Sequence, residues 1–369
     1  MDEKLTKRSL DRRSFLKLAG GVVAGAALTA CSSPSAPSAA PTKAPEGAKS
    51  AAEPTKAAAP AVASGKKFLI KCGVPTNVDY PFHQGYEYFG KKLVEATNGA
   101  VEWQSFPNGQ LGSNRDLTEG VKLGTIQMTV ASSELTQFVP EWDVISLPYL
   151  YDSYAQCYKV GDGEVGKFYE QKLDAAGFKL IGFFSGGTRS VFTAKKPVRS
   201  LDDLKGLKIR VQQNKVHIAA FNALGAISTP LAYNELYSAL QQGVVDGAEN
   251  DPTAILDMKF NEVCKYYTLT KHFIEGMGRP FVMNKSFFES LPADIQKLVL
   301  QFGKEATDLE RKYFEEVEGK ALADLKSKGM EIIEIDTAPL AKVVREQVFP
   351  TIEGKDKQDL IAKILATKA

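Results

Sequence analysis

The chain has 369 residues, of which 44% are hydrophobic and 24% are charged, and its formal net charge is +2. Residues 1–65 carry a net charge of +4, which leaves −2 for the rest of the chain. This balance argues against a nucleic-acid-binding surface. The roughly 300 residues after position 65 suffice for two domains of ordinary size.

The first thirty residues have the features of an export signal. Arg12 and Arg13 precede Ser-Phe-Leu-Lys, which resembles a twin-arginine export motif, and an apolar stretch runs from Leu18 to Ala30. This stretch is too short to cross a bilayer core of about 30 Å, which needs about 20 apolar residues. We therefore expect residues 1–30 to be a removable secretion signal.

A lipid anchor and a tether are predicted next. Cys31 follows Leu28-Thr29-Ala30, which resembles the bacterial lipobox, where the cysteine is lipidated. Each buried methylene of an acyl chain contributes about 0.8 kcal/mol to membrane attachment. Residues 31–65 contain one valine and no aromatic residue, so they cannot bury enough apolar surface to offset the entropy of ordering. We expect them to form a disordered tether between the membrane and the folded body.

Predicted strands and helices alternate through the folded body. Hydrophobic patterns and turn residues predict strands over residues 68–74, 101–106, 126–131, 178–184, 207–211 and 244–248, and helices over 86–97, 116–123, 165–176, 216–224 and 234–242. This alternation predicts an α/β body with largely parallel sheets. A helical pattern over residues 293–328 would be about 50 Å long, which exceeds one domain and favours a helix that bridges two.

Residues that would indicate catalysis or metal binding are sparse. The three histidines form no HxxxH pair, and there is no P-loop, dinucleotide motif or nucleophile elbow. We therefore predict no enzyme activity, no cofactor and no metal site. The remaining cysteines are widely spaced and odd in number, which favours buried thiols over a disulfide framework and leaves one disulfide open, among Cys72, Cys157 and Cys264.

Two arginines occupy positions where a charge needs an explanation. Arg210 lies in a short apolar strand, where a buried cation is costly unless it is paired. Arg189 follows Gly186-Gly187-Thr188, just after another predicted strand, and ligands of open α/β sheets bind beyond strand ends. A guanidinium matches a carboxylate bidentately, so both could form one anion site. Alternatively, each pairs with a neighbouring acid such as Asp202, Asp203 or Glu249.

A series of motifs resembles one transporter family. The stretches 206–211, 223–226, 229–230, 235–242 and 245–250 resemble the substrate-binding proteins of tripartite ATP-independent periplasmic (TRAP) transporters, the DctP-like family. Further matches lie at residues 106–112, 119–126, 259–263 and 291–294. The resemblance covers residues 66 to about 328 in the expected order.

The resemblance implies a fold and a mode of action. It implies a two-domain, periplasmic-binding-protein-like α/β fold with a ligand cleft between the lobes, crossing strands and a long bridging helix. We expect residues 66–186 with 276–315 to form lobe I, and residues 187–275 with 316–369 to form lobe II. Closure of the lobes on a small organic acid would present a joint surface to the membrane permease subunits. An ion gradient drives such permeases, so no nucleotide site is expected.

The resemblance also implies site residues. Arg210 matches the carboxylate-clamping arginine of the family, and Arg189 resembles a second arginine of the sugar-acid binders. Asn250 and Gln213 match hydrogen-bonding positions, and Tyr233 matches an aromatic residue that packs on the ligand. On the side of the other lobe, the lining residues implied are Asn114, Ser132 and Thr76.

The ligand that the resemblance favours is a uronate or an aldonate. Sialic-acid binders carry a glutamate where this chain has Ser132 and an aspartate where it has Asn114, which argues against sialic acid. Other readings stay open: a C4-dicarboxylate or other carboxylate binder, a ligand-sensing module for a receptor kinase, or an exported enzyme. The expected location is extracytoplasmic, in the periplasm or on the outer face of the cytoplasmic membrane, with the protein held by its lipid.

Overall fold

The computed structural model describes residues 66–369 of the chain. The predicted export signal, the predicted lipidation site Cys31 and the predicted tether lie outside the described residues. In the described part, every helix is too short or too polar to cross a membrane.

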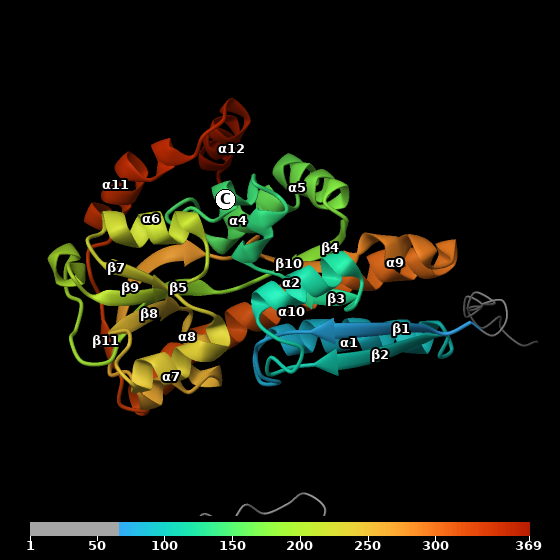
Figure 1. The fold of residues 1–369 in the computed structure, drawn as a ribbon, viewed down its shortest axis with the longest axis horizontal. Coiled ribbons are helices and arrows are strands. Elements are labelled where there is room, and N and C mark those ends of the chain that lie inside the picture. Colours follow the sequence, from blue (N-terminus) through green and yellow to red (C-terminus); the bar gives the residue numbers. More distant parts are fainter. Residues whose placement is uncertain (1–65) are drawn as a thin grey trace, which may run out of the picture. The chain divides into compact units, whose positions relative to one another are not determined.

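The first of two sheets has the strand order β2-β1-β3-β10-β4. Its strands are β1 (Phe68–Gly73), β2 (Val101–Phe106), β3 (Met128–Val130), β4 (Phe178–Phe184) and β10 (Arg279–Asn284). The helices associated with it are α1 (Phe82–Ala96), α2 (Asn114–Leu123), α5 (Glu164–Ala175) and α9 (Lys285–Ser290). This sheet and its helices make up lobe I (Figure 1).

The second sheet has the strand order β11-β9-β5-β8-β6-β7. Its strands are β5 (Thr188–Thr193), β6 (Lys208–Val211), β7 (Ile227–Pro230), β8 (Gly247–Asn250), β9 (Tyr266–Ile274) and β11 (Glu331–Ile333). The helices that follow its strands are α6 (Lys215–Ala223), α7 (Leu236–Gln241) and α8 (Pro252–Asp257). This sheet and these helices make up lobe II.

The prediction of largely parallel sheets is wrong. Strand β10 is antiparallel to β3 and β4, and β5 is antiparallel to β8 and β9, so both sheets are mixed. The physical reason is the crossing between the lobes. The chain leaves the first sheet through β4 and enters the second through β5, and it returns through β9 and β10 beside that path. A chain that returns along its own path must run in the opposite direction.

The long helix predicted at residues 293–328 is confirmed by α10 (Ala293–Ser327). It contacts α1 and β4 of lobe I and also α8 and β11 of lobe II, so it bridges the two lobes (Figure 1). Its buried residues recur at helical spacing, from Ile295 and Val299 through Phe302 and Ala306 to Phe314. The packing of this apolar stripe holds the helix against both lobes.

We propose that the two lobes meet where the sequence analysis expected, because the chain changes sheets at Gly186–Gly187 and again between Ile274 and Arg279.

The C-terminal segment contacts both lobes. Helix α11 (Ala338–Gln347) packs on α6 of lobe II, whereas α12 (Lys355–Ala366) packs on α3 (Trp142–Ile145). The side chain of Gln156 in α4 (Tyr154–Gly161) also donates to the carbonyl of Ile364, at 3.3 Å.

The three described cysteines are buried, and none forms a disulfide. Burial raises the pKa of Cys157 and of Cys264 to about 12. These thiols therefore act as small apolar side chains of the core.

Candidate functional site

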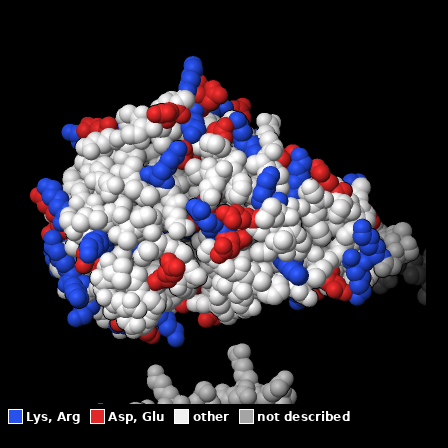
Figure 2. Space-filling model, in the orientation of Figure 1, with Lys and Arg blue, Asp and Glu red and all other residues white. Residues whose placement is uncertain are grey.

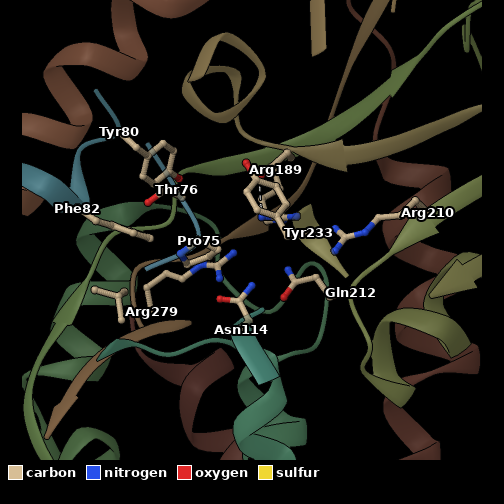
Figure 3. Close-up of a pocket in the computed structure, with 12 residues that line it drawn as sticks. Pro75, Thr76, Tyr80, Phe82, Asn114, Arg189, Arg210, Gln212, Tyr233 and Arg279 are labelled. Carbon is tan, nitrogen blue, oxygen red and sulfur yellow. Dashed lines mark hydrogen bonds between the residues drawn. The ribbon is translucent and has the colours of Figure 1, made fainter. Parts of the chain in front are cut away.

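A small cavity lies between the lobes (Figure 3). Lobe I contributes Pro75, Thr76, Tyr80, Phe82, Asn114, Val130 and Arg279. Lobe II contributes Arg189, Arg210, Gln212, Tyr233 and Asn250. Six of the eight residues predicted from the sequence thus line one cavity, and Ser132 and Gln213 do not.

Arg210 projects from β6 into the cavity as a buried side chain, 3% exposed. Its Nε and Nη2 donate to the carbonyl oxygen of Leu231, at 3.0 and 2.7 Å. No carboxylate in residues 66–369 forms an ion pair with it. Burial lowers the pKa of Arg210 to about 10, and the neighbouring Arg189 contributes to this shift. At neutral pH the guanidinium is still charged, so the cavity contains a cation that lacks an internal counter-ion.

Arg189 in β5 is buried and paired, which is the alternative that the sequence left open. Its Nε and Nη2 donate to the two carboxylate oxygens of Glu249, at 2.6 and 2.8 Å. Burial by itself disfavours the charged form, but the Glu249 and Glu275 carboxylates raise the pKa of Arg189 well above its ordinary value. Arg189 follows the end of β4, and it lies inside the next strand, β5, which the sequence analysis did not predict.

The pairing of Arg189 orients Asn250 at the end of β8. Arg189 Nη1 donates to Asn250 Oδ1 at 2.6 Å, and the backbone N–H of Asp251 donates to the same oxygen at 3.0 Å. With Oδ1 occupied twice, the amide nitrogen of Asn250 is the group left for a ligand. Arg189 therefore fixes the orientation of the Asn250 amide at the cavity.

Two hydroxyl groups at the cavity are buried without a hydrogen-bond partner. They are the Oγ1 of Thr76 and the phenolic oxygen of Tyr233. A buried polar atom without a partner costs about 1 to 3 kcal/mol, and such atoms are rare in folded proteins. Both atoms belong to residues that line the cavity.

Gln213 is exposed, and its neighbour Gln212 lines the cavity instead. Alternation continues past the end of β6, so Arg210 and Gln212 face the same side while Gln213 faces solvent. Gln212 Oε1 accepts hydrogen bonds from Ser133 Oγ at 2.8 Å and from Ser132 Oγ at 3.3 Å. Ser132 is thus buried behind Gln212, where it supports a lining residue.

Sequence reasoning missed Arg279, Gln212, Tyr80 and Phe82. The sequence did contain a signal for Arg279. This arginine begins an apolar strand after Gly276-Met277-Gly278, and Arg210 likewise lies in an apolar strand. Tyr80 and Phe82 gave none, since aromatic residues are common in cores as well as in ligand sites.

Hydrogen bonds between the lobes surround the cavity. Tyr80 donates to Asp251 Oδ2 at 3.1 Å, and the side chain of Asn77 donates to the carbonyl of Asp257 at 2.7 Å. Gln212 bonds to Ser133 as described above. The two lobes therefore enclose the cavity on more than one side. No group of three His, Cys, Asp or Glu side chains in the described part of the chain could hold a metal ion.

Comparisons with known proteins agree with this geometry. Residues 74–353 match the family model described as bacterial extracellular solute-binding protein, family 7. The chain is 36% identical over 271 residues to the C4-dicarboxylate-binding periplasmic protein DctP of Rhodobacter capsulatus. The aligned region covers 72% of this chain and 80% of the relative.

Two solved structures are similar over almost their whole length. One is a TRAP periplasmic solute-binding protein from Sulfitobacter sp. NAS-14.1 with bound β-D-galacturonate, with a TM-score of 0.77 and 32% identity. It covers 80% of this chain and 99% of its own. The other is a TRAP solute-binding protein from Roseobacter denitrificans OCh 114 with bound L-galactonate, with a TM-score of 0.78 and 30% identity. It covers 82% of this chain and 100% of its own.

Proposed function

Because the chain belongs to the bacterial extracellular solute-binding proteins of family 7, we propose that it captures a small organic acid outside the cytoplasm for a membrane permease. It would be the receptor of a tripartite ATP-independent transporter. The single observation that supports an acid as the ligand is Arg210. It is a buried guanidinium that faces an interlobe cavity and has no carboxylate partner in residues 66–369. A buried charge of this kind is stabilised by an anionic guest.

Binding and closure follow from the arrangement of donors. The ligand carboxylate accepts from Arg210 on lobe II, while Thr76 and Asn114 approach it from lobe I. These contacts from lobe I exist only when the lobes have closed. A ligand shifts the equilibrium toward the closed form by the free energy of the contacts that it makes in that form alone.

The ligand that fits best is a uronate or an aldonate. The Sulfitobacter and Roseobacter proteins bind galacturonate and galactonate. In this cavity, uncharged amides and hydroxyls dominate the polar lining beside the arginines, and they match the several hydroxyl groups of a sugar acid. The Rhodobacter relative binds a C4-dicarboxylate, so a dicarboxylate is the second candidate.

Attachment to the membrane and simple binding complete the proposal. The protein would be exported through its twin-arginine signal and anchored through a lipid on Cys31. It would release its ligand unchanged, since the residues that line the cavity include no serine, cysteine, lysine or histidine to act as a nucleophile or base.

A thermal-shift screen tests the proposed function. Uronates, aldonates, C4-dicarboxylates and the neutral sugars of matching structure are compared at fixed pH and ionic strength. A true ligand stabilises the folded protein by about 2.7 kcal/mol at a hundredfold excess over Kd. We expect at least one uronate or aldonate to raise the melting temperature and the neutral sugars to have no effect. Stabilisation by neutral sugars alone would refute the acid assignment.

A further inference from the structure

Three guanidinium groups reach the cavity, but their charges are not equivalent. The charge of Arg189 is matched by the bidentate contact with Glu249. The charge of Arg279 is matched by Glu275, because Arg279 Nε and Nη2 both lie 2.9 Å from Glu275 Oε2. Only Arg210, among the three, has no carboxylate partner in residues 66–369.

Arg279 and Arg210 approach the cavity from different lobes. Arg279 begins β10 of lobe I, and Arg210 lies in β6 of lobe II. Figure 3 shows the guanidinium of Arg279 pointing toward Asn114 and Gln212, while that of Arg210 enters from the opposite side. A ligand whose carboxylate lies on Arg210 therefore presents its far end to Arg279. The Nη1 of Arg279 makes no hydrogen bond within the described residues, so it is free to donate to that end.

Glu275 lies between the two compensated arginines. Its Oε2 is 3.4 Å from Arg189 Nη1 and 2.9 Å from Arg279 Nε, and its Oε1 accepts a hydrogen bond from Gln212 at 3.4 Å. Its side chain is 5% exposed. Although burial raises its pKa, Arg279 and Arg189 lower it below the ordinary value, so the carboxylate is ionised. Arg279 thus lines the cavity while it contacts a buried anion that does not itself line it.

We infer that Glu275 makes this protein selective for monocarboxylates, because it neutralises Arg279 at the end of the cavity opposite Arg210. This inference rests on the proposed function and specifies the charge of its ligand. A hydroxyl group at the far end accepts a hydrogen bond from Arg279 at little cost. A second carboxylate there loses its hydration, is repelled by the nearby Glu275 carboxylate and gains no uncompensated cation. Selectivity against the dicarboxylate arises from that repulsion.

Matched acids test the inference. D-galactonate and galactarate share the same carbon chain and hydroxyl configuration and differ only at C6, which is a hydroxymethyl group or a carboxylate. L-threonate and L-tartrate form a shorter pair of the same kind. Calorimetry at fixed ionic strength gives the affinity ratio within each pair. For the wild-type protein we expect the monocarboxylate of at least one pair to bind about tenfold more tightly or better.

The variant Glu275→Gln is isosteric and leaves Arg279 uncompensated. We expect its ratio of monocarboxylate to dicarboxylate affinity to fall by about tenfold or more, because the dicarboxylate binds more tightly. The double variant Glu275→Gln/Arg279→Gln removes the freed cation as well, so its ratio should return toward the wild-type value. Equal wild-type affinities within both pairs, or an affinity ratio unchanged in Glu275→Gln, would overturn the inference while leaving acid binding intact.

A second variant tests the inference if Glu275→Gln does not fold. In that case, shown by the lack of a cooperative melt, the single variant Arg279→Gln is measured instead. It leaves Glu275 without that partner, so dicarboxylate binding should weaken further relative to the monocarboxylate. An unchanged ratio in Arg279→Gln would contradict the inference. If no acid of the wider screen binds the wild-type protein, the proposed function itself fails.

Discussion

Glu318 in the long helix α10 accepts a hydrogen bond from the backbone N–H of Thr188 at 2.6 Å. Eight residues earlier on the same helix, Glu310 accepts one from the backbone N–H of Ser185 at 2.8 Å. The two carboxyl groups therefore hold both sides of Gly186–Gly187, where the chain crosses between the lobes. Gly187 has a φ of +79°, which disfavours any residue with a side chain. Helix α10 thus braces the segment where the chain crosses between the lobes.

Glu318 should make the protein less stable as the pH rises. Burial raises the pKa of Glu318 to about 7. Between its ordinary pKa and pH 7, the unfolded chain releases a proton that the folded protein keeps, so the free energy of unfolding falls through this window. Between pH 5 and pH 8, we expect the free energy of unfolding of the wild type to fall by roughly 1 to 3 kcal/mol more than that of Glu318→Gln. Urea denaturation of both proteins across that range checks this, and identical pH profiles would contradict it.

His217 should have the opposite effect, at acidic pH. It is 2% exposed, its Nε2 has no partner, and it packs on Phe273 with ring centroids 4.8 Å apart. Burial lowers the pKa of His217 to about 4. As the pH falls from 6.5 to 4, the unfolded chain takes up a proton that the folded protein does not, so stability falls. His217→Phe should reduce this acid-induced loss by roughly 2 to 3 kcal/mol, as measured by denaturation at pH 7 and pH 4.5.

Arg210 should determine acid binding through both its charge and its shape. Arg210→Gln removes the charge, and loss of a buried charge contact costs roughly 2 to 5 kcal/mol of binding free energy. Arg210→Lys keeps a charge but lacks the planar fork, so its affinity should lie between those of the wild type and Arg210→Gln. Calorimetry with the best acid from the screen gives the three affinities. Wild-type affinity in Arg210→Gln would remove the basis of the proposed function.

The unpaired hydroxyl of Tyr233 should weaken the empty protein and strengthen the complex. Tyr233→Phe deletes a buried group that lacks a partner, so the unliganded protein should gain up to about 1 kcal/mol of stability. The same change should weaken ligand binding by roughly three- to tenfold, because a ligand hydrogen bond is lost. Melting curves with and without ligand separate the two effects. A variant that is destabilised when empty would contradict the assignment.

Asn214 has two roles that one substitution can separate. Its Oδ1 caps α6 by accepting from the backbone N–H of Val216 at 2.8 Å, and its Nδ2 donates across the cleft to Thr136 Oγ1 at 2.9 Å. Asn214→Ser keeps an uncharged capping oxygen and loses the amide donor, so ligand affinity should fall with little loss of stability. Asn214→Ala loses both and should also lose about 1 kcal/mol of stability. Equal ligand affinities in Asn214→Ser and the wild type would show that the contact across the cleft does not contribute to closure.

Local pattern predicted much of the secondary structure. The predicted strands at residues 101–106 and 178–184 coincide with β2 and β4, and the predicted long helix ends within one residue of α10. Such elements are predictable because hydrophobic period and turn residues act over a few positions. Strand direction was not predictable, since it depends on the path between the lobes.

Charge was the feature that local reasoning left open. For both Arg189 and Arg210 the sequence allowed pairing with an acid, and only Arg189 is paired, with Glu249, which lies 60 residues away along the chain. Likewise, the family resemblance implied Gln213, and only the direction of the side chains after the strand identified Gln212.

The sequence by itself determined the family, the α/β class and Arg210 as a residue of the cavity, since each depends on residues close together in the chain. The tertiary structure decided which arginine keeps an uncompensated charge and which residues complete the cavity. The physical reason is that a buried charge is matched only by groups within a few ångströms, and folding brings those groups together from distant parts of the chain.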